Sequence, residues 1–445
     1  MKRISILSDV LGPIMRGPSS SHTAASYAIG SYARGALGEP VCQAEITFRQ
    51  GSSYAVCFRR QGSDLGFAAG LLGWEMTDSR FRRALELAPA EGLDIRFEVG
   101  TLTEDDHPNA VHLRLIGASG GRLEMTARSI GGGMFEVTDL DGRPANVRGP
   151  EPLPKRGDAP FCSAGGMSAW MGRSRMGAGE AGLLYEAQLL GVEPDVVRAE
   201  MQRRFAVMRE AVHEGLQPDG DAMILLDRSA ASIYEAESRG RVAIGGMHTR
   251  AAARAMAAMH TNCSMGVVCA APTAGSAGVV PGVIVTLADE LGASDEDCVR
   301  CLLAAGLIGV FIAERATFAA EIAGCQVEIG AATAMAAAAV VEYAHGAAAQ
   351  ACDAAAVSLQ NTMGSVCDLV QGVVEIPCHT RNAVGASSAF VVADLILGGY
   401  RNPRPLDETI DAVLAVGQML PEELRVTSRG GIAVAPSALA MTMRR

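Results

Sequence analysis

From about residue 165 to its end, the 445-residue chain follows a helical pattern almost throughout. Ala-rich stretches such as GAATAMAAAAVVEYAHGAAAQA (330–351) dominate this part, and small side chains let helices approach closely. Hydrophobic residues make up 49% of the chain and aromatic residues only 4%, which favours tightly packed helical cores of Ala, Val, Leu and Met. We therefore expect residues 165–445 to form one all-helical domain.

The first part of the chain mixes strand and helix patterns. Helical patterns fall at 23–37 and 78–88, and strand-like alternation is found at 41–48, 52–58, 93–99, 110–117 and 122–130. The segment DLDGRPANVRGPEPLPKRGDAP (139–160) is dense in Pro, Gly and charge, as linkers are. The predicted fold class is therefore α+β: an N-terminal mixed α/β domain (1–145), a linker (146–164) and the helical domain (165–445).

Charge and cysteine content limit the possible partners. The net charge of −11 and the pI near 5.3 argue against a nucleic-acid surface. Residues 255–288 lack charged side chains, but their prolines, glycines and polar residues favour two short buried helices around a loop over a membrane span. With eleven cysteines and no signal peptide at Met1, the sequence predicts a reduced, cytoplasmic protein without a membrane partner.

The stretch GPSSSHTAA (17–25) is the first candidate site. A Gly-Pro turn precedes several polar side chains at the start of a helical run, namely Ser19, Ser20, Ser21, His22 and Thr23. Hydroxyl groups and free backbone N–H groups at a helix start can bind an anion such as a substrate carboxylate. The alternative is an ordinary N-cap with spare serines. Because one serine is enough for a cap, we favour a binding role.

Two further segments are weaker candidates. Ser129 belongs to RSIGGGMFEV (128–137), where three glycines follow a strand and allow close approach of the backbone to a ligand. A β-bulge or a tight turn would use the same glycines. His107 precedes a proline in DDHPNAV (105–111), a context that is more typical of a surface histidine than of a catalyst.

Cysteine is the chemically most suggestive residue type here. Cys325, Cys367 and Cys378 all lie between helix and loop patterns with Gly or Pro nearby. Thiolates are the usual ligands of iron–sulfur clusters, and three of them on a four-iron cube leave one iron open as a Lewis acid. Free cysteines are also common in helical cores, so the spacing alone leaves both interpretations open.

The other cysteines and the lysines limit the metal sites and cofactors that we expect. CVRC (298–301) has no partner pair at zinc-ribbon spacing, which favours a packing role, and Cys263 and Cys269 are weaker candidates near a site. The only lysines are Lys2, near the N-terminus, and Lys155, in the predicted linker. Neither position suits a buried Schiff base, so we expect no pyridoxal phosphate.

Several of these motifs together resemble one family. GPSSSHTA, SIGGG, APTAGSAGVVPG, GCQVEIG and CDLVQGVVEIPCHTRNAVGA are similar to segments of bacterial iron–sulfur L-serine dehydratases (L-serine ammonia-lyases) in their single-chain form, and the resemblance covers nearly the whole chain. It implies a [4Fe–4S] cluster held by Cys325, Cys367 and Cys378. It also implies a substrate loop at Ser19–Thr23, Arg381 as a candidate partner of the substrate carboxylate, and a homodimer.

Two departures from the family pattern bear on the chemistry. Where the family commonly has a histidine in a GHGTD segment, this chain has RQGSD, with Gln61 at that place. Glutamine cannot act as a base, so His22, His107 or another group takes the role, or the substrate differs. Some single-chain members end in a cysteine that reaches the cluster, whereas this chain ends in TMRR and its last cysteine is Cys378.

The resemblance predicts α,β-elimination of L-serine to pyruvate and ammonia. The departure at Gln61 keeps open a related reaction on another β-substituted amino or hydroxy acid, of the cysteine, threonine or hydroxyaspartate type. A cluster-bearing sensor without turnover is a third possibility, but a sensor has no need of a substrate loop. Turnover of any β-hydroxy or β-thio amino acid distinguishes an enzyme from a sensor.

Overall fold

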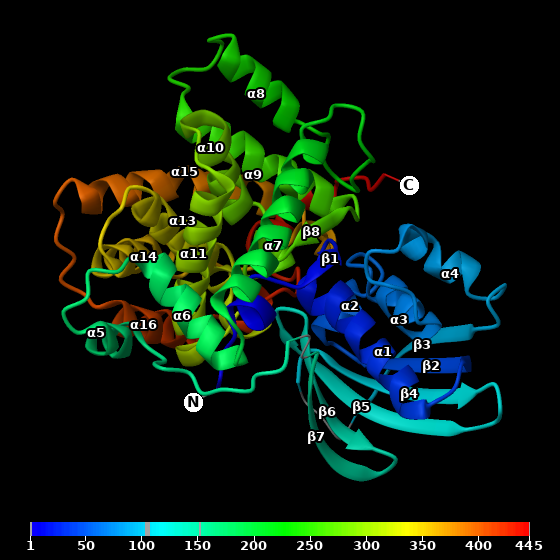
Figure 1. Cartoon of the computed structure of the whole chain (residues 1–445). Coiled ribbons are helices and arrows are strands. Elements are labelled where there is room, and N and C mark those ends of the chain that lie inside the picture. Colours follow the sequence, from blue (N-terminus) through cyan, green and yellow to red (C-terminus); the bar gives the residue numbers. More distant parts are fainter. Residues whose placement is uncertain (1, 103–106, 151–152, 445) are drawn as a thin grey trace.

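The computed structural model describes residues 2–102, 107–150 and 153–444. A domain built on one β-sheet lies beside a larger helical body (Figure 1), which confirms the predicted α+β class. The sheet has six strands in the order β3-β2-β4-β5-β6-β7, and only the β2–β3 pair is parallel. The strands are β2 (Val41–Arg49), β3 (Asp94–Gly100), β4 (Ala110–Gly117), β5 (Arg122–Gly131), β6 (Met134–Leu140) and β7 (Arg143–Gly149).

The sheet domain buries one side of its strands under helices. Alternate residues of β4, such as Leu113 and Leu115, are buried, as expected for a sheet with one covered face. Helices α1 (Ala25–Leu37) and α3 (Ser63–Leu72) pack on each other, and α1 also packs on β5 and β6. A short helix, α4 (Ala84–Leu87), completes this layer.

One element of this domain differs from the prediction. Residues 52–58, expected as a strand, contain the helix α2 (Ser53–Cys57), because the Ser52 side chain caps it by accepting a hydrogen bond from the N–H of Ala55 at 3.0 Å. The first part of the Pro- and Gly-rich segment forms β7, joined to β6 by a tight turn at Asp141–Gly142. Residues 151–152 of the predicted linker lie outside the described residues.

The helical body packs its helices around a core of small and branched apolar residues. Within the described residues it contains α5 (Ala164–Met171), α6 (Ala178–Leu190), α7 (Pro194–Gly215), α8 (Ala230–Ser238), α9 (Met247–Cys263), α10 (Val279–Leu291), α11 (Asp295–Arg315), α12 (Ala320–Ala323), α13 (Ile329–Tyr343), α14 (Ala348–Thr362), α15 (Cys378–Leu397), α16 (Leu406–Met419) and α17 (Pro436–Leu439). As predicted, residues 255–288 form two helices, α9 and α10, around a loop. That loop contains a short strand, β8 (Val267–Cys269), which the all-helical prediction missed.

The N-terminal segment belongs to the packing of the helical body. Residues Ile6–Val10 form a helical turn that packs on α11 and α6, and the strand β1 (Ile14–Arg16) pairs antiparallel with β8. The chain then enters the serine-rich loop (17–24), in which Ser20–Ala24 form a helical turn capped by the Ser19 hydroxyl, and it continues directly into α1 of the sheet domain. The serine-rich loop therefore lies at the junction of the two parts (Figure 1).

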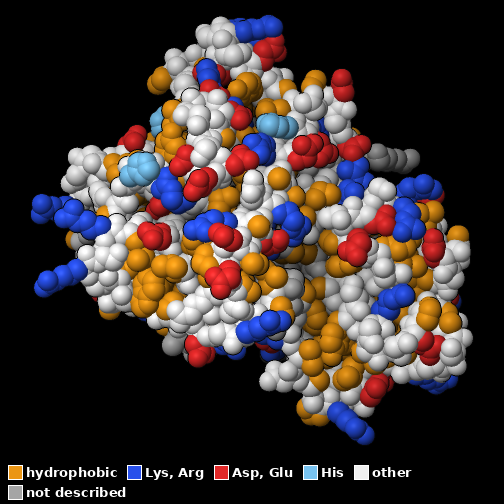
Figure 2. Space-filling model, in the orientation of Figure 1, with side chains coloured by type: hydrophobic (Ala, Val, Ile, Leu, Met, Phe, Trp, Pro, Cys, Tyr) orange, Lys and Arg blue, Asp and Glu red, His pale blue; other side chains and the backbone are white. Residues whose placement is uncertain are grey.

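The surface shown in Figure 2 is mixed in charge, and a long apolar segment lies inside the protein. On the face shown in Figure 2, acidic and basic side chains are interspersed rather than gathered in one patch. Within the described residues, one segment, Cys325–Tyr343, is long and apolar enough to cross a membrane, but 94% of its most apolar 18-residue window is buried inside the protein. Burial of this kind is typical of the central helix of a large core.

Candidate active site

The serine-rich loop is clamped between α9 and the segment APTAGSAG (271–278). Gly17 lies directly against the backbone of Asn262, at a distance that only glycine allows. The Asn262 amide donates hydrogen bonds to the carbonyl oxygens of Pro18 and Ala274, both at 3.0 Å. The Ser20 hydroxyl accepts a hydrogen bond from the N–H of Ala274 at 3.3 Å. The loop is thus held against the helical body at several points.

His22 lies at the centre of this loop and is fully buried. Its Nδ1 atom lies 3.2 Å from the Ser19 hydroxyl and 3.0 Å from the Ser21 hydroxyl, and its Nε2 atom lies 3.2 Å from the Ser53 hydroxyl. Burial lowers the pKa of His22, and the nearby Glu321 carboxylate offsets this only in part. His22 is therefore held in its neutral form, surrounded by hydroxyl groups.

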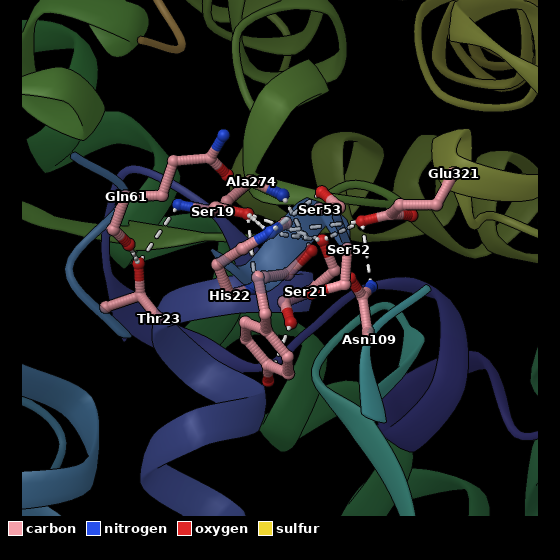
Figure 3. Close-up of polar contacts among 12 residues, drawn as sticks. Ser19, Ser21, His22, Thr23, Ser52, Ser53, Gln61, Asn109, Ala274 and Glu321 are labelled. Carbon is pink, nitrogen blue, oxygen red and sulfur yellow. Dashed lines mark hydrogen bonds and ion pairs between the residues drawn. The ribbon is translucent and has the colours of Figure 1, made fainter. Parts of the chain in front are cut away.

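A carboxylate from the helical body reaches this network. Glu321 of α12 accepts hydrogen bonds at Oε1 from the Ser21 hydroxyl at 2.7 Å and from the Asn109 amide at 3.1 Å (Figure 3). The same oxygen lies 3.9 Å from Nδ1 of His22. Side chains from the serine loop, the start of β4 and α12 thus meet at one buried point.

The SIGGG segment forms the tight turn between β5 and β6. Gly131, Gly132 and Gly133 all have positive φ angles, which strongly favour glycine. Gly131 lies against Ala319, just before α12, so the turn is docked beside Glu321. Ser129, on the strand before the turn, is buried next to the Tyr54 hydroxyl. This turn thereby connects the sheet domain with α12.

The other predicted residues of the N-terminal part have structural contacts. The Thr23 hydroxyl donates to the carbonyl oxygen of Gln61 at 2.5 Å. His107 accepts a hydrogen bond at Nδ1 from the N–H of Asn109 at 3.2 Å and so shapes the turn before β4. Gln61, at the place of the family histidine, is buried, and its amide donates to the carbonyl oxygen of Gly372 at 3.1 Å.

Cys325, Cys367 and Cys378 lie together in one buried apolar cluster with residues such as Met259, Ile329 and Val374. Each occupies a loop or the beginning of a helix, and each is at most 4% exposed. A fourth thiol, that of Cys263, belongs to the same cluster and donates to the carbonyl oxygen of Val374 at 2.9 Å. Cys269, the other weak candidate, packs in the main helical core instead.

The cysteines influence one another's ionisation. A hydrogen bond with the Cys367 thiol, helped by the Arg381 guanidinium, lowers the pKa of Cys325 to about 7. The same hydrogen bond raises the pKa of Cys367 well above its usual value, and burial does the same for Cys378. Buried thiols in this state can bind a cationic metal centre that takes the place of their protons.

The donor set fits an iron–sulfur cluster better than a single ion. Among the described residues, no three His, Cys, Asp or Glu side chains are grouped closely enough to hold one metal ion. In a four-iron cluster each thiolate binds a different iron atom, so its ligands need not converge on one point. Three buried thiols in one apolar cluster have the chemistry that such a cofactor requires.

Arg381 stands beside the cysteines, but its guanidinium is engaged. It donates to the carbonyl oxygen of Val366 at 2.7 Å and to the Asp368 carboxylate at 3.0 Å. Asn382, one residue further, accepts hydrogen bonds from Gly278 and Val279 and donates to Gly275 and Cys378. These contacts tie the start of α15, and with it Cys378, to the segment that also holds the serine loop.

Sequence reasoning missed Glu321, Asn109 and Ser53. A weak signal existed for two of them, because Glu321 lies four residues before Cys325 and Asn109 lies two residues after His107. No recognisable motif marks any of the three. They become visible only when the sheet domain and the helical body are seen packed together.

The chain is similar in sequence to one family of known proteins. Residues 102–433 match the family model described as "Serine dehydratase alpha chain". An "L-serine dehydratase" of Mycobacterium tuberculosis is 30% identical over 94% of this chain and 95% of its own length. A "Probable L-serine dehydratase, alpha chain" of Bacillus subtilis is 40% identical over 54% of this chain and 79% of its own length.

Proposed function

Because the chain belongs to the serine dehydratase family, as the resemblance of its motifs predicted, we propose that it is an iron–sulfur-dependent ammonia-lyase that converts L-serine to pyruvate and ammonia. One observation carries this proposal: the segment 262–278 holds both the serine-rich loop, through Asn262, and the start of α15 with Cys378, through Asn382. These contacts support the proposal that the serine-rich loop and the three buried thiols belong to one site.

The reaction removes the Cα proton of serine, forms the Cα=Cβ double bond and expels the β-hydroxyl group as hydroxide. Cys325, Cys367 and Cys378 would hold the cluster, which when bound supplies a Lewis-acidic iron for the leaving group. The resulting aminoacrylate tautomerises to an imine, and water converts the imine to pyruvate and ammonia.

The chain's own side chains bind the substrate and move the proton. The hydroxyl groups of Ser19 and Ser20 would bind the substrate carboxylate. Because the Ser21 hydroxyl donates its proton to Glu321, Nδ1 of His22 carries the ring proton. His22 would therefore take up the Cα proton at Nε2, relayed by the Ser53 hydroxyl 3.2 Å away. Because burial lowers the pKa of His22, this base is neutral and competent at pH 7. The acid limb of the pH profile of kcat/KM should therefore lie below the usual histidine range.

The test is anaerobic reconstitution with iron and sulfide, followed by assays of 2-keto acid release from L-serine, L-cysteine and L-threonine. We expect pyruvate from serine, with activity lost on exposure to air. Cys325→Ser, Cys367→Ser and Cys378→Ser should each lose bound iron and turnover. Cys162→Ser is the matched control, because Cys162 is half-buried and lies outside the cysteine cluster.

Other assay outcomes would change the proposed substrate or contradict the proposed reaction. Turnover of cysteine or threonine in preference to serine would favour the related lyase that the Gln61 departure left open. A cluster that forms without turnover of any of the three would contradict the proposed elimination.

We also propose a cytoplasmic location, in keeping with eleven unpaired cysteines, and a homodimer, which light scattering can test.

A further inference from the structure

Glu321 is a buried carboxylate with incomplete partners. Its residue is only 6% exposed, and both of its hydrogen bonds, from Ser21 and Asn109, are made to Oε1. Within the described part of the chain, Oε2 receives no hydrogen bond. A buried charged group in this situation is costly unless another donor or a cation completes it.

Among the described residues, no arginine or lysine side chain forms an ion pair with Glu321. In this part of the chain, the one basic group nearby is His22, at 3.9 Å. His22 is enclosed by the hydroxyl groups of Ser19, Ser21 and Ser53 and by the Tyr54 ring, and its burial disfavours the charged form. No charged basic side chain of the described residues is therefore paired with Glu321, and the carboxyl group of Glu328 adds an unfavourable interaction with it.

Two other buried carboxylates show how the chain satisfies such a group for structural purposes. Glu186 accepts hydrogen bonds from the Ser5 hydroxyl and from the N–H groups of Ile6 and Leu7, and these occupy both of its oxygens. Glu375 likewise uses both oxygens to accept the N–H groups of residues 224–226. Glu342 also leaves Oε2 without a donor, but its Oε1 accepts from the Arg300 guanidinium at 2.9 Å. Glu321 differs from all three, because within the described residues its Oε2 has no donor and no arginine or lysine pairs with it.

The Asn109 amide adds a second acceptor next to Glu321. Since a carboxylate accepts only, the amide must present its nitrogen to Glu321, and this leaves Oδ1 at the same end of the side chain. Asn109 is 1% exposed, and its Oδ1 atom has no hydrogen-bond partner within the described residues. A carboxylate and a carbonyl oxygen side by side are suited to a group with several N–H donors and a positive charge.

Resting on the proposed function, we propose that Glu321, with Asn109 beside it, binds the α-ammonium group of the amino-acid substrate. The ammonium group supplies both the charge that Glu321 lacks and the donors that the two side chains can accept. The pair would select amino acids over hydroxy acids of the same shape. Ser21, which bonds to Glu321, then places its hydroxyl close to the carbon that carries the ammonium group.

The experiment compares two probes that differ only in this group. L-Alanine carries the ammonium group and L-lactate carries a hydroxyl in its place. Their affinities are measured by calorimetry on the anaerobically reconstituted protein, alongside KM and kcat for L-serine. The variants are Glu321→Gln, which keeps the shape, Glu321→Asp, which keeps the charge, and Glu186→Gln, a matched control at a buried carboxylate outside the site.

We expect Glu321→Gln to weaken L-alanine binding roughly 10- to 100-fold and to leave L-lactate binding unchanged. Glu321→Asp should recover part of the preference, and Glu186→Gln should keep the wild-type ratio of the two affinities. An equal loss for both probes in Glu321→Gln would mean a merely structural role and would overturn the proposal.

The ammonium site and the proposed function can be refuted separately. Wild-type affinity for L-alanine in Glu321→Gln, with serine turnover present in the wild type, would refute the ammonium site alone. A wild-type protein that neither binds L-alanine nor turns over serine would refute the proposed function and this site together.

Discussion

Gln61 extends its amide across the boundary between the sheet domain and the helical body. It donates to the carbonyl oxygen of Gly372, while the neighbouring Arg60 donates to that of Gln371. Both acceptors belong to the loop that connects Cys367 with Cys378. A glutamine at this place therefore serves to fix the cysteine loop, and a proton acceptor must be sought elsewhere in the site.

We expect Gln61→Ala to lower the free energy of unfolding by about 1–3 kcal/mol, because it leaves the carbonyl oxygen of Gly372 without its buried donor. Gln188→Ala, at an exposed position of α6, should change it by no more than about 0.5 kcal/mol. Denaturant unfolding of the apoprotein under anaerobic conditions measures both. Equal midpoints for the two variants would show that the hydrogen bond to Gly372 does not hold the loop.

Among individual residues, the sequence could identify candidates that stand in a run of polar side chains or that have rare chemistry. Ser19–Thr23 form such a group, and the structure brings Ser19, Ser21 and His22 together. The three cysteines stand out through rare chemistry, and they share one buried cluster. Glu321 and Asn109 are single polar residues in ordinary surroundings, and their partners lie up to 300 positions away in the chain. Only tertiary packing defines their role.

At the scale of elements, the approach of α1 to α3 positions the serine loop, because α1 continues directly from it. Glycines at the crossing make this possible: a Cβ atom on Gly70 would collide with the backbone of α1, and one on Gly66 with the carbonyl oxygen of Thr23 just before α1. Sequence periodicity revealed α1 but missed α3, and it mistook the capped helix α2 for a strand. Local capping by Ser52 outweighed the strand propensity of that short segment.

We expect Gly70→Ala to cost about 1–3 kcal/mol, because the new methyl group meets the carbonyl oxygen of Tyr27 and must push the two helices apart. Gly35→Ala is the matched control within α1, where nothing lies within 4 Å of the new atom. That change should raise stability by about 0.5–1 kcal/mol through helix propensity. Thermal unfolding of both variants checks the opposite signs, and a shift of the same sign in both would contradict the close crossing.

At the scale of the whole molecule, the N-terminal segment connects what the sequence predicted as separate parts. The division at residues 146–164 stays a prediction, but the first residues of the chain pack within the helical body before the chain enters the sheet domain. Ile6 is fully buried against Gly306 of α11, and Glu186 holds the same turn. Hydrophobic patterning could not reveal this docking, because so short a segment carries no periodic signal of its own.

The packing of this segment leads to a test at a position very near the N-terminus. We expect Ile6→Ala to lower the free energy of unfolding by about 2–5 kcal/mol, the usual cost of a cavity in a packed core. Ile244→Ala, at a side chain that is 98% exposed, should stay within about 0.5 kcal/mol of the wild type. Because β1 and the serine loop follow this turn, Ile6→Ala should also loosen the loop and raise KM for serine. Equal stability of the two variants would mean that the N-terminal turn is not part of the core.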